Sequence, residues 1–390
     1  MRYIINIIIL LLICSACPIA QEIWLPSNPL DGRIVFEEKG CIYCHSVSGY
    51  GGTVGPDLGR SQYYGSFLQL ASIIWNHIPE MDRKYREVKV PRPNFTQDEM
   101  LNLIGFLYYL RYLGEPGSVA NGKKLLDSKG CLNCHSIAGK GGILGPDFNK
   151  MRQFASPLYI VQAMWNHGPA MQEEIKKSNL KYPTLTGQDI VDISAYIQQA
   201  ALGNTEIKMS PGNPVKGKQV FQNKNCQNCH SIDGKNKKLG PSLSEINLKM
   251  SVTEIAGVMW NHSPDMIEYM KNQSIKWPQF EGNEMADLIA YLYFLGFEDE
   301  PGNPEEGENV FVDKGCASCH QEGGKGIGPD LKEMKRFGNP IRLTQLMWNH
   351  APKMEDLLLA QNEEWPQLTA KQMQDLYIYL KSVTQKKRGY

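Results

Sequence analysis

The stretch Cys131-Leu-Asn-Cys-His135 decides the fold, because the same pattern, Cys-x-x-Cys-His, occurs four times at a nearly fixed period. The other copies are Cys41-Ile-Tyr-Cys-His45, Cys226-Gln-Asn-Cys-His230 and Cys316-Ala-Ser-Cys-His320. Their first cysteines lie 90 to 95 residues apart, and a fixed period of this kind indicates tandem copies of one structural unit. The chain has 390 residues, which suits several small domains rather than one.

The spacing of these residues is the attachment signal for c-type haem. Each of the two thiols adds to one vinyl group of the porphyrin, and the adjacent histidine ligates the iron from the proximal side. We therefore predict four covalently bound haem c groups, each with its iron. The predicted covalent residues are Cys41, Cys44, Cys131, Cys134, Cys226, Cys229, Cys316 and Cys319, and the predicted proximal ligands are His45, His135, His230 and His320.

Two other interpretations of the cysteine pairs are weaker. A Cys₂His₂ zinc site needs four ligands around a tetrahedron, but here the first histidine is fused to the second cysteine and the next histidine of each repeat is far along the chain. A thioredoxin-type redox pair would need a βαβ pattern around it, and the sequence predicts helices and no strands.

Each motif lies in the same longer frame. A glycine nine residues upstream opens a short helix that carries a bulky apolar residue four positions later: Gly32 and Phe36, Gly122 and Leu126, Gly217 and Phe221, Gly307 and Phe311. Downstream come a Gly-Pro pair, at Gly55, Gly145, Gly240 and Gly328, and then the pattern Trp-Asn-His-x-Pro-x-Met. An amphipathic helix closes each repeat; Met100, Leu103, Ile104 and Leu107 form its apolar face in repeat 1. Capping boxes are predicted at Thr96-x-x-Glu99 and Thr369-x-x-Gln372.

The distal ligand of each iron has two candidates in Trp-Asn-His-x-Pro-x-Met, and the residue types alone do not choose between them. The methionines are Met81, Met171, Met266 and Met354, and the histidines are His77, His167, His262 and His350. Met is favoured because the preceding proline is expected to end the helix, which leaves the methionine on a loop that can turn toward the iron. Imidazole is the stronger ligand, so histidine stays open as the alternative. The tryptophan is expected to be a wall of the haem pocket, or else to bond a haem propionate.

Each repeat resembles a class I cytochrome c domain in its Gly-to-Phe helix, its Cys-x-x-Cys-His, its Gly-Pro loop and the aromatic of its closing helix (Phe106, Tyr196, Tyr291, Tyr379). The resemblance implies an all-α fold of four tandem small cytochrome c-like helical domains. It also implies that the closing aromatic crosses the first glycine, and that the carbonyls of Pro56, Pro146, Pro241 and Pro329 accept from the proximal imidazoles. The family usually places a ligating methionine before the closing helix. This chain has Arg92-Pro93, Tyr182-Pro183, Trp277-Pro278 and Trp365-Pro366 there instead.

The first residues are typical of an export signal. Arg2 precedes the apolar run from Ile4 to Ile13, which is much shorter than the ~20 residues of a membrane span. Cleavage before Cys17, as in a lipoprotein with a lipid tether to the membrane, is favoured over ordinary cleavage near Ala20. We expect a signal peptide at residues 1–20 and cytochrome c domains at 28–115, 118–203, 213–298 and 303–386.

A haem ligated on both faces has no open position for a substrate, which favours electron transfer over catalysis. We therefore expect an exported, non-enzymatic electron carrier in the periplasm or at the cell surface, with redox proteins as its partners. The formal net charge is zero, which disfavours nucleic acid as a partner. The alternatives are a subunit of a haem enzyme or respiratory complex with one open haem, for which repeat 4 is the first candidate, and a protomer of an extracellular cytochrome polymer.

Overall fold

The computed structural model describes residues 26, 28, 30–47, 49–59, 65–110, 116–151, 156–202, 212–232, 238–243, 250–297, 299, 301–321, 323, 325–331 and 338–385. The predicted signal peptide at 1–20, with Cys17, lies outside these residues. Among the described residues, none of the helices has the length and apolar character needed to span a bilayer.

Three helices recur in every repeat: a short one before the cysteine motif, a long one after it and a closing one. Repeat 1 contains α1 (Asp31–Glu38), η1 (Cys41–Tyr43), β1 (Ser46–Val47), β2 (Tyr50–Gly51), α2 (Phe67–Val88) and α3 (Gln97–Tyr109). Repeat 2 contains α4 (Val119–Ser128), η2 (Cys131–Asn133), β3 (Ser136–Ile137), β4 (Lys140–Gly141), η3 (Phe148–Met151), α5 (Pro157–Lys177) and α6 (Gly187–Leu202). Repeat 3 contains α7 (Pro214–Asn223), η4 (Cys226–Asn228), α8 (Val252–Asn272) and α9 (Glu284–Leu295). Repeat 4 contains α10 (Pro304–Asp313), α11 (Cys316–Cys319), α12 (Pro340–Ala360) and α13 (Ala370–Gln385).

The structure corrects the prediction that no strands form. β1 pairs with β2 and β3 with β4, each as an antiparallel two-residue hairpin directly after the cysteine motif. Gly51 and Gly141 take positive φ values of 127° and 113° there. Two paired residues are too few to give an alternating sequence pattern, so periodicity could not reveal them. The fold remains dominated by helices, as predicted.

The first and closing helices of each repeat cross at the predicted glycine. A Cβ on Gly32 would lie 1.9 Å from the carbonyl oxygen of Asn102 and 2.5 Å from Cβ of Phe106. The same crossing joins Gly122 to Tyr196, Gly217 to Tyr291 and Gly307 to Tyr379. Only glycine permits this approach of two backbones, and the expectation that the closing aromatic crosses the first glycine is confirmed.

Closing helix α3 has the predicted cap and apolar face. Thr96 Oγ1 accepts from the Glu99 amide at 3.2 Å, and the Glu99 carboxylate accepts from the Thr96 amide at 2.7 Å. Met100, Leu103 and Ile104 are buried, and Leu107 packs against the same core. The second predicted capping box, at Thr369 and Gln372, also forms.

The long helices do not end at their prolines, contrary to the prediction. Pro79, Pro169, Pro264 and Pro352 lie inside α2, α5, α8 and α12, and each helix continues for two or more turns beyond its proline. A proline inside a helix lacks the amide that would bond the carbonyl four residues earlier. The carbonyl left free belongs in each case to the tryptophan of Trp-Asn-His, and other residues of the fold satisfy it.

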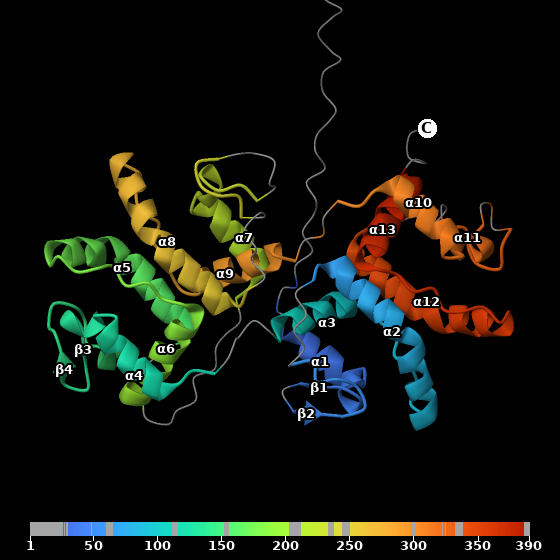
Figure 1. Cartoon of the computed structure of the whole chain (residues 1–390), viewed down its shortest axis with the longest axis horizontal. Helices are drawn as coiled ribbons and strands as arrows, with labels where there is room; N and C mark the ends of the chain where they lie inside the picture. Colours follow the sequence, from blue (N-terminus) through green and yellow to red (C-terminus); the bar gives the residue numbers. More distant parts are fainter. Residues whose placement is uncertain are drawn as a thin grey trace, which may run out of the picture.

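The repeats pack as two pairs and not in a row along the chain. Figure 1 shows α1–α3 and α10–α13 in one lobe, and α4–α9 in the other. Repeat 1 therefore packs on repeat 4, through α2 with α12 and α13, while repeat 2 packs on repeat 3, through α5 and α6 with α8. The lobes meet at the end of α9, where the rings of Phe297 and Tyr108 lie 4.3 Å apart and the Tyr293 hydroxyl donates to the Tyr108 carbonyl.

Candidate haem sites

The proximal histidines are held identically in all four repeats. Nδ1 of His45, His135, His230 and His320 lies 3.1, 3.0, 3.0 and 2.9 Å from the carbonyl oxygens of Pro56, Pro146, Pro241 and Pro329. As a donor in this bond, Nδ1 carries the proton and leaves the Nε2 lone pair free for a metal. The predicted contact is confirmed.

The glycine before each of these prolines lies against the imidazole, where a larger residue would clash with the ring. A Cβ on Gly55 would lie 2.4 Å from Cε1 of His45, and one on Gly328 would lie 2.7 Å from Cε1 of His320. The Asp57 carboxylate accepts from the amides of Gly49 and Gly59, which fixes the loop that carries Pro56. Asp57 is thus the residue that stabilises this turn.

The environment of the motif cysteines suits covalent attachment better than redox exchange. Burial raises the pKa of Cys41, Cys131, Cys226 and Cys316 to about 11. A reactive redox cysteine needs a lowered pKa, so the thioredoxin-type alternative is disfavoured. Within the part of the chain that the structure describes, no three His, Cys, Asp or Glu residues cluster as a metal site would require. The described residues therefore do not assemble the Cys₂His₂ zinc alternative.

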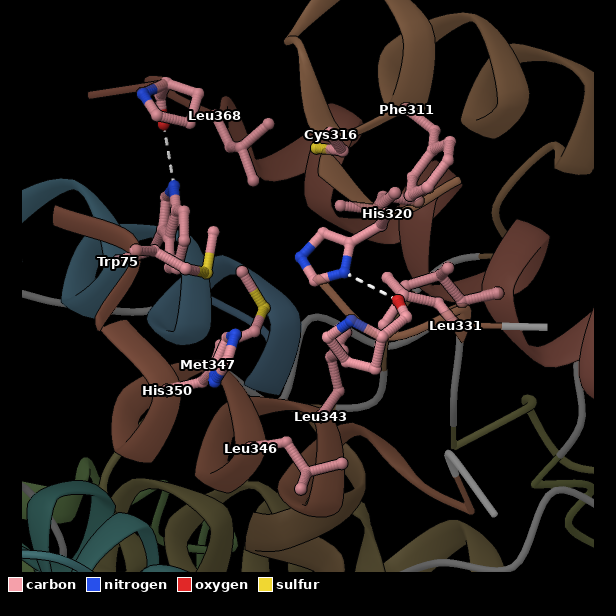
Figure 2. Close-up of a pocket in the computed structure, with 15 residues that line it drawn as sticks. Trp75, Phe311, Cys316, His320, Leu331, Leu343, Leu346, Met347, His350 and Leu368 are labelled. Atoms are coloured by element: carbon pink, nitrogen blue, oxygen red, sulfur yellow. Dashed lines mark hydrogen bonds between the residues drawn. The ribbon is translucent and has the colours of Figure 1, made fainter. Parts of the chain in front are cut away.

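Repeat 4 has an apolar cavity, partly open to solvent, above His320 (Figure 2). His320 projects into it from one side, and Met347 and His350 face it from α12. The cavity is lined by Trp75, Phe311, Cys316, His320, Pro329, Leu331, Leu343, Leu346, Met347, His350, Met354, Pro366, Leu368, Leu376 and Leu380. One of these residues, Trp75, belongs to repeat 1.

Both predicted distal candidates of repeat 4 reach this cavity, because His350 and Met354 are one helical turn apart on α12. The ring centroids of His320 and His350 lie 6.0 Å apart. Burial lowers the pKa of His350, and His320 adds to the effect. In repeat 3 burial lowers the pKa of His230, and His262 contributes. The structure thus brings the two histidines of repeat 4 together, and in repeat 3 they interact electrostatically.

The histidines of α2 and α5 are anchored to their own helices. Nδ1 of His77 lies 2.7 Å from the Ile73 carbonyl, and Nδ1 of His167 lies 2.8 Å from the Ala163 carbonyl. Met81 and Met171 are partly buried and pack against the hydrophobic core. A histidine held in this way presents Nε2 away from the helix axis in a fixed orientation.

The indole N–H of each of these tryptophans donates a hydrogen bond to a carbonyl of another repeat and not of its own. Nε1 of Trp75 donates to the Pro366 carbonyl at 2.7 Å, and Nε1 of Trp348 donates to the Pro93 carbonyl at 2.8 Å. In the other lobe, Trp165 donates to Pro278 and Trp260 to Pro183, at 2.9 and 2.8 Å. The expectation that the indole bonds a propionate is wrong, because its one N–H is used here. The expected pocket wall is found for Trp75, but in the paired repeat.

The asparagine after each tryptophan makes two bonds to the same segment. Oδ1 of Asn76 accepts from the Leu368 amide and its Nδ2 donates to the Leu368 carbonyl, both at 2.9 Å. Asn166 pairs in this way with Phe280, Asn261 with Leu185, and Asn349 with Phe95. We call each such unit a clasp: the Trp-Asn of one long helix with segment 92–95, 182–185, 277–280 or 365–368 of the paired repeat.

The residue before the proline of each segment completes the clasp. The Trp365 ring lies tilted against Trp75 with ring centroids 4.3 Å apart. Trp277 stacks on Trp165 at 4.5 Å and Tyr182 on Trp260 at 4.7 Å, and the Arg92 guanidinium lies 4.1 Å from the Trp348 ring centroid. The tryptophan carbonyls that the helix prolines leave free accept from Trp365, Trp277 and Arg92 in three clasps. In the fourth, the Trp260 carbonyl accepts from Ser263, whose hydroxyl lies 3.0 Å from that of Tyr182.

Sequence reasoning found these segments only as a departure from a family pattern. The signal that could have identified them is that Trp-Asn and x-Pro-x-Phe/Leu recur together in every repeat. The sequence could not show that the partner of each Trp-Asn lies in another repeat.

The residues of the sites fit haem c. Each repeat supplies a cysteine pair, a proximal imidazole with a fixed Nδ1 bond and a glycine that makes room for it; repeat 4 adds a largely apolar cavity with a second imidazole opposite. A largely apolar cavity between two imidazoles suits a planar organic group that binds a metal at its centre.

Comparison with known families agrees with this chemistry. The family described as Cytochrome c matches residues 119–201, 214–295 and 304–384, which are repeats 2, 3 and 4. No curated protein matches the chain. Repeat 1 carries the same glycine crossing, cysteine motif and proximal bond as the three matched repeats.

Proposed function

This chain belongs to the cytochrome c family, and we propose that it is an exported cytochrome with four covalent haem c groups that transfers electrons between redox proteins outside the cytoplasmic membrane. One observation carries the proposal: the proximal bond between a motif histidine and a Gly-Pro carbonyl is built four times in one chain. The chain is thus a multihaem c-type cytochrome, and cytochromes of this family are electron carriers.

In each repeat the two motif cysteines would hold the haem through thioether bonds, and the motif histidine would ligate its iron. When bound, the haem supplies one-electron exchange between Fe(II) and Fe(III). The chain supplies fixed orientation of the proximal ring through the proline carbonyl. It also supplies an apolar lining, which in repeat 4 would reduce the contact of a bound haem with water.

For the distal side we propose His77, His167, His262 and His350, rather than the methionines that the sequence favours. A metal–imidazole bond of about 2 Å places two imidazoles on opposite faces of one metal with ring centres roughly 6 Å apart. His320 and His350 have this separation. The argument for methionine depended on a loop after the proline, and α12 continues through that position. Met81, Met171, Met266 and Met354 then pack beside the haem.

With both axial positions taken by the chain, a substrate has no place on the iron, so the proposed role is electron transfer and not catalysis. Export is supported by the N-terminal apolar run and by the placement of all eight downstream cysteines in haem motifs. The partners would be a donor and an acceptor protein, with no nucleic acid and with a lipid tether at Cys17 as part of the proposal.

Carbon monoxide binding to the reduced protein tests the axial assignment. The wild type should bind none, since every iron is closed on both sides. His350→Ala should bind one equivalent per chain, while the matched variant Met354→Ala, one turn along α12, should bind none. The reverse pattern would assign the distal position to methionine, and binding by the wild type would contradict a closed electron carrier.

A further inference from the structure

We propose that the four haem sites work as two coupled pairs, repeat 1 with repeat 4 and repeat 2 with repeat 3, because each long helix bonds to the paired repeat through its Trp-Asn and, in repeat 4, this contact completes the haem pocket. The inference rests on the proposed function, since it concerns where the bound haems exchange electrons. According to this proposal, the clasps, and not the order of the repeats along the chain, determine which haems exchange electrons directly.

The pocket of repeat 4 carries the first part of the argument. Its wall includes Trp75, which is 4% exposed and comes from α2 of repeat 1 (Figure 2). Two further wall residues, Pro366 and Leu368, are held by hydrogen bonds from repeat 1, to Trp75 and Asn76. The pocket of repeat 4 is therefore incomplete without repeat 1.

The same turn of α2 also carries His77, the proposed distal ligand of repeat 1. His77 stands two residues after Trp75, so the two side chains leave the helix in different directions. Two turns further on, burial raises the pKa of Tyr85, and the Cys41 and Cys44 thiols of repeat 1 add to the effect. Helix α2 therefore has the haem site of repeat 4 on one side and that of repeat 1 on another. A helix with its side chains is about 10–12 Å across.

The pairing is reciprocal. Trp348 of repeat 4 donates to Pro93 of repeat 1 just as Trp75 donates to Pro366. Repeats 2 and 3 repeat the exchange through Trp165 and Trp260. Phe297, Tyr108 and Tyr293, which join the lobes, are not among the residues that line the repeat 4 pocket. The close connection between sites is thus within a lobe.

In this arrangement an electron that crosses a clasp oxidises one iron from Fe(II) to Fe(III) and reduces the paired iron from Fe(III) to Fe(II). No proton, oxidant or further reactant is required. Consecutive sites in sequence, such as those of repeats 1 and 2, lie in different lobes and exchange electrons only after the pairs have equilibrated.

Proton NMR of the haem methyl groups in the oxidised full-length protein tests the pairing without an activity assay. Two variants mark the signals: Leu346→Val lines the repeat 4 pocket and identifies haem 4, and Tyr85→Phe identifies haem 1. Trp75→Phe removes the indole wall and its N–H. We expect it to shift the set of signals that Leu346→Val shifts, although residue 75 belongs to repeat 1. Trp75→Tyr, which keeps a donor, is the second variant if Trp75→Phe does not fold.

The matched control is Trp165→Phe, the same motif position in the other lobe, which should leave the haem 4 set unmoved. If Trp75→Phe shifts the haem 1 set and leaves the haem 4 set in place, the pairing is wrong. Equal shifts of the haem 4 set by Trp165→Phe would also overturn it. Fewer than four haem sets in the wild type would instead contradict the proposed function, which is a distinguishable result.

Discussion

The glycine of each Gly-Pro pair is the residue on which the proximal site depends most directly. In repeat 2, a Cβ on Gly145 would lie 2.5 Å from both Cε1 and Nδ1 of His135. Gly145→Ala should therefore push the imidazole from its bond with Pro146. We expect a loss of roughly 1–3 kcal/mol in the free energy of unfolding, as for other overpacked sites, together with a changed absorption spectrum at one haem.

Gly168 in the same repeat is the matched control. It lies inside α5, and a Cβ there would be 3.5 Å from Cδ1 of Ile267, an ordinary contact. Gly168→Ala should stabilise the protein by about 0.5–1 kcal/mol, because alanine loses less backbone entropy in a helix. Chemical denaturation measures the free energy of unfolding of both variants. A destabilisation of similar size for the two variants would show that the crowding at His135 is not the cause.

Asp82 gives the clasp of repeats 1 and 4 a pH dependence. Burial and, to a smaller extent, Glu355 raise the pKa of its carboxyl to about 6, against the opposing effect of the Arg92 guanidinium, whose Nη1 lies 2.6 Å from Oδ2. The folded state therefore binds the proton more tightly than the unfolded state does. Stability from this group is fully present below the unfolded pKa, near 4, and is lost as pH rises to about 6.

Asp82→Asn should abolish this loss of stability between about pH 4 and pH 6. Thermal unfolding of wild type and variant between pH 4 and pH 7 provides the measurement. At the equivalent position repeats 2 and 3 have Gln172 and Ile267, so Gln172→Glu is a suitable comparison. A wild-type profile parallel to that of Asp82→Asn over this range would contradict the assignment.

At the scale of the element, the proline in each long helix and the clasp are coupled, because the proline frees a carbonyl that then accepts a hydrogen bond. Pro79 leaves the Trp75 carbonyl without its helical donor, and Nε1 of Trp365 donates to it at 3.1 Å. Trp365→Phe should leave that carbonyl unsatisfied and cost about 1–3 kcal/mol. In a Pro79→Ala background the new amide satisfies the carbonyl, so the same substitution should cost clearly less.

A double-mutant cycle in chemical denaturation measures this coupling, and it cancels the loss of ring area that both backgrounds share. Pro264→Ala offers the control, because Ser263 of the same helix already serves the Trp260 carbonyl. Additive effects of Trp365→Phe and Pro79→Ala would show that the indole does not replace the missing helical bond.

Several elements could be predicted from sequence because their determinants are local. The cap at Thr96 and the apolar face of α3 involve residues three to seven positions apart, whereas the bond from His45 to Pro56 was available only through family resemblance. The helix crossing at Gly32 and Phe106 was available only through family resemblance. The continuation of α2 past Pro79 was missed, because it depends on a donor from Trp365, 290 residues away.

At the scale of the whole molecule, the clasps divide the chain into two lobes that should respond separately. Asn76→Ala deletes both bonds to Leu368 and leaves a buried amide and carbonyl unpaired, at a cost of about 2–4 kcal/mol. Amide hydrogen exchange should accelerate in α2, α12 and α13 and stay unchanged in α5 and α8. Asn166→Ala should give the opposite distribution. Acceleration spread evenly over both lobes would argue against the pairing as a unit of stability.

The lobes themselves could not be read from the sequence. Four repeats with the same motif give each Trp-Asn several equivalent segments to bind, and nothing local distinguishes repeat 4 from repeat 2 as the partner of repeat 1. The position that covers the partner tryptophan is arginine in repeat 1 (Arg92), tyrosine in repeat 2 (Tyr182) and tryptophan in repeats 3 and 4 (Trp277, Trp365). These residue types are visible in the sequence, but only the structure shows which tryptophan each of them covers.

Coulometric titration of the purified full-length protein, followed by visible absorption, tests the central claim most directly. The account predicts four electrons taken up reversibly per chain, with a c-type absorption band that grows in proportion to the charge. The variant Cys226→Ala/Cys229→Ala should take up three. A chain that accepts no electrons, or whose uptake is not accompanied by that band, would contradict a multihaem electron carrier.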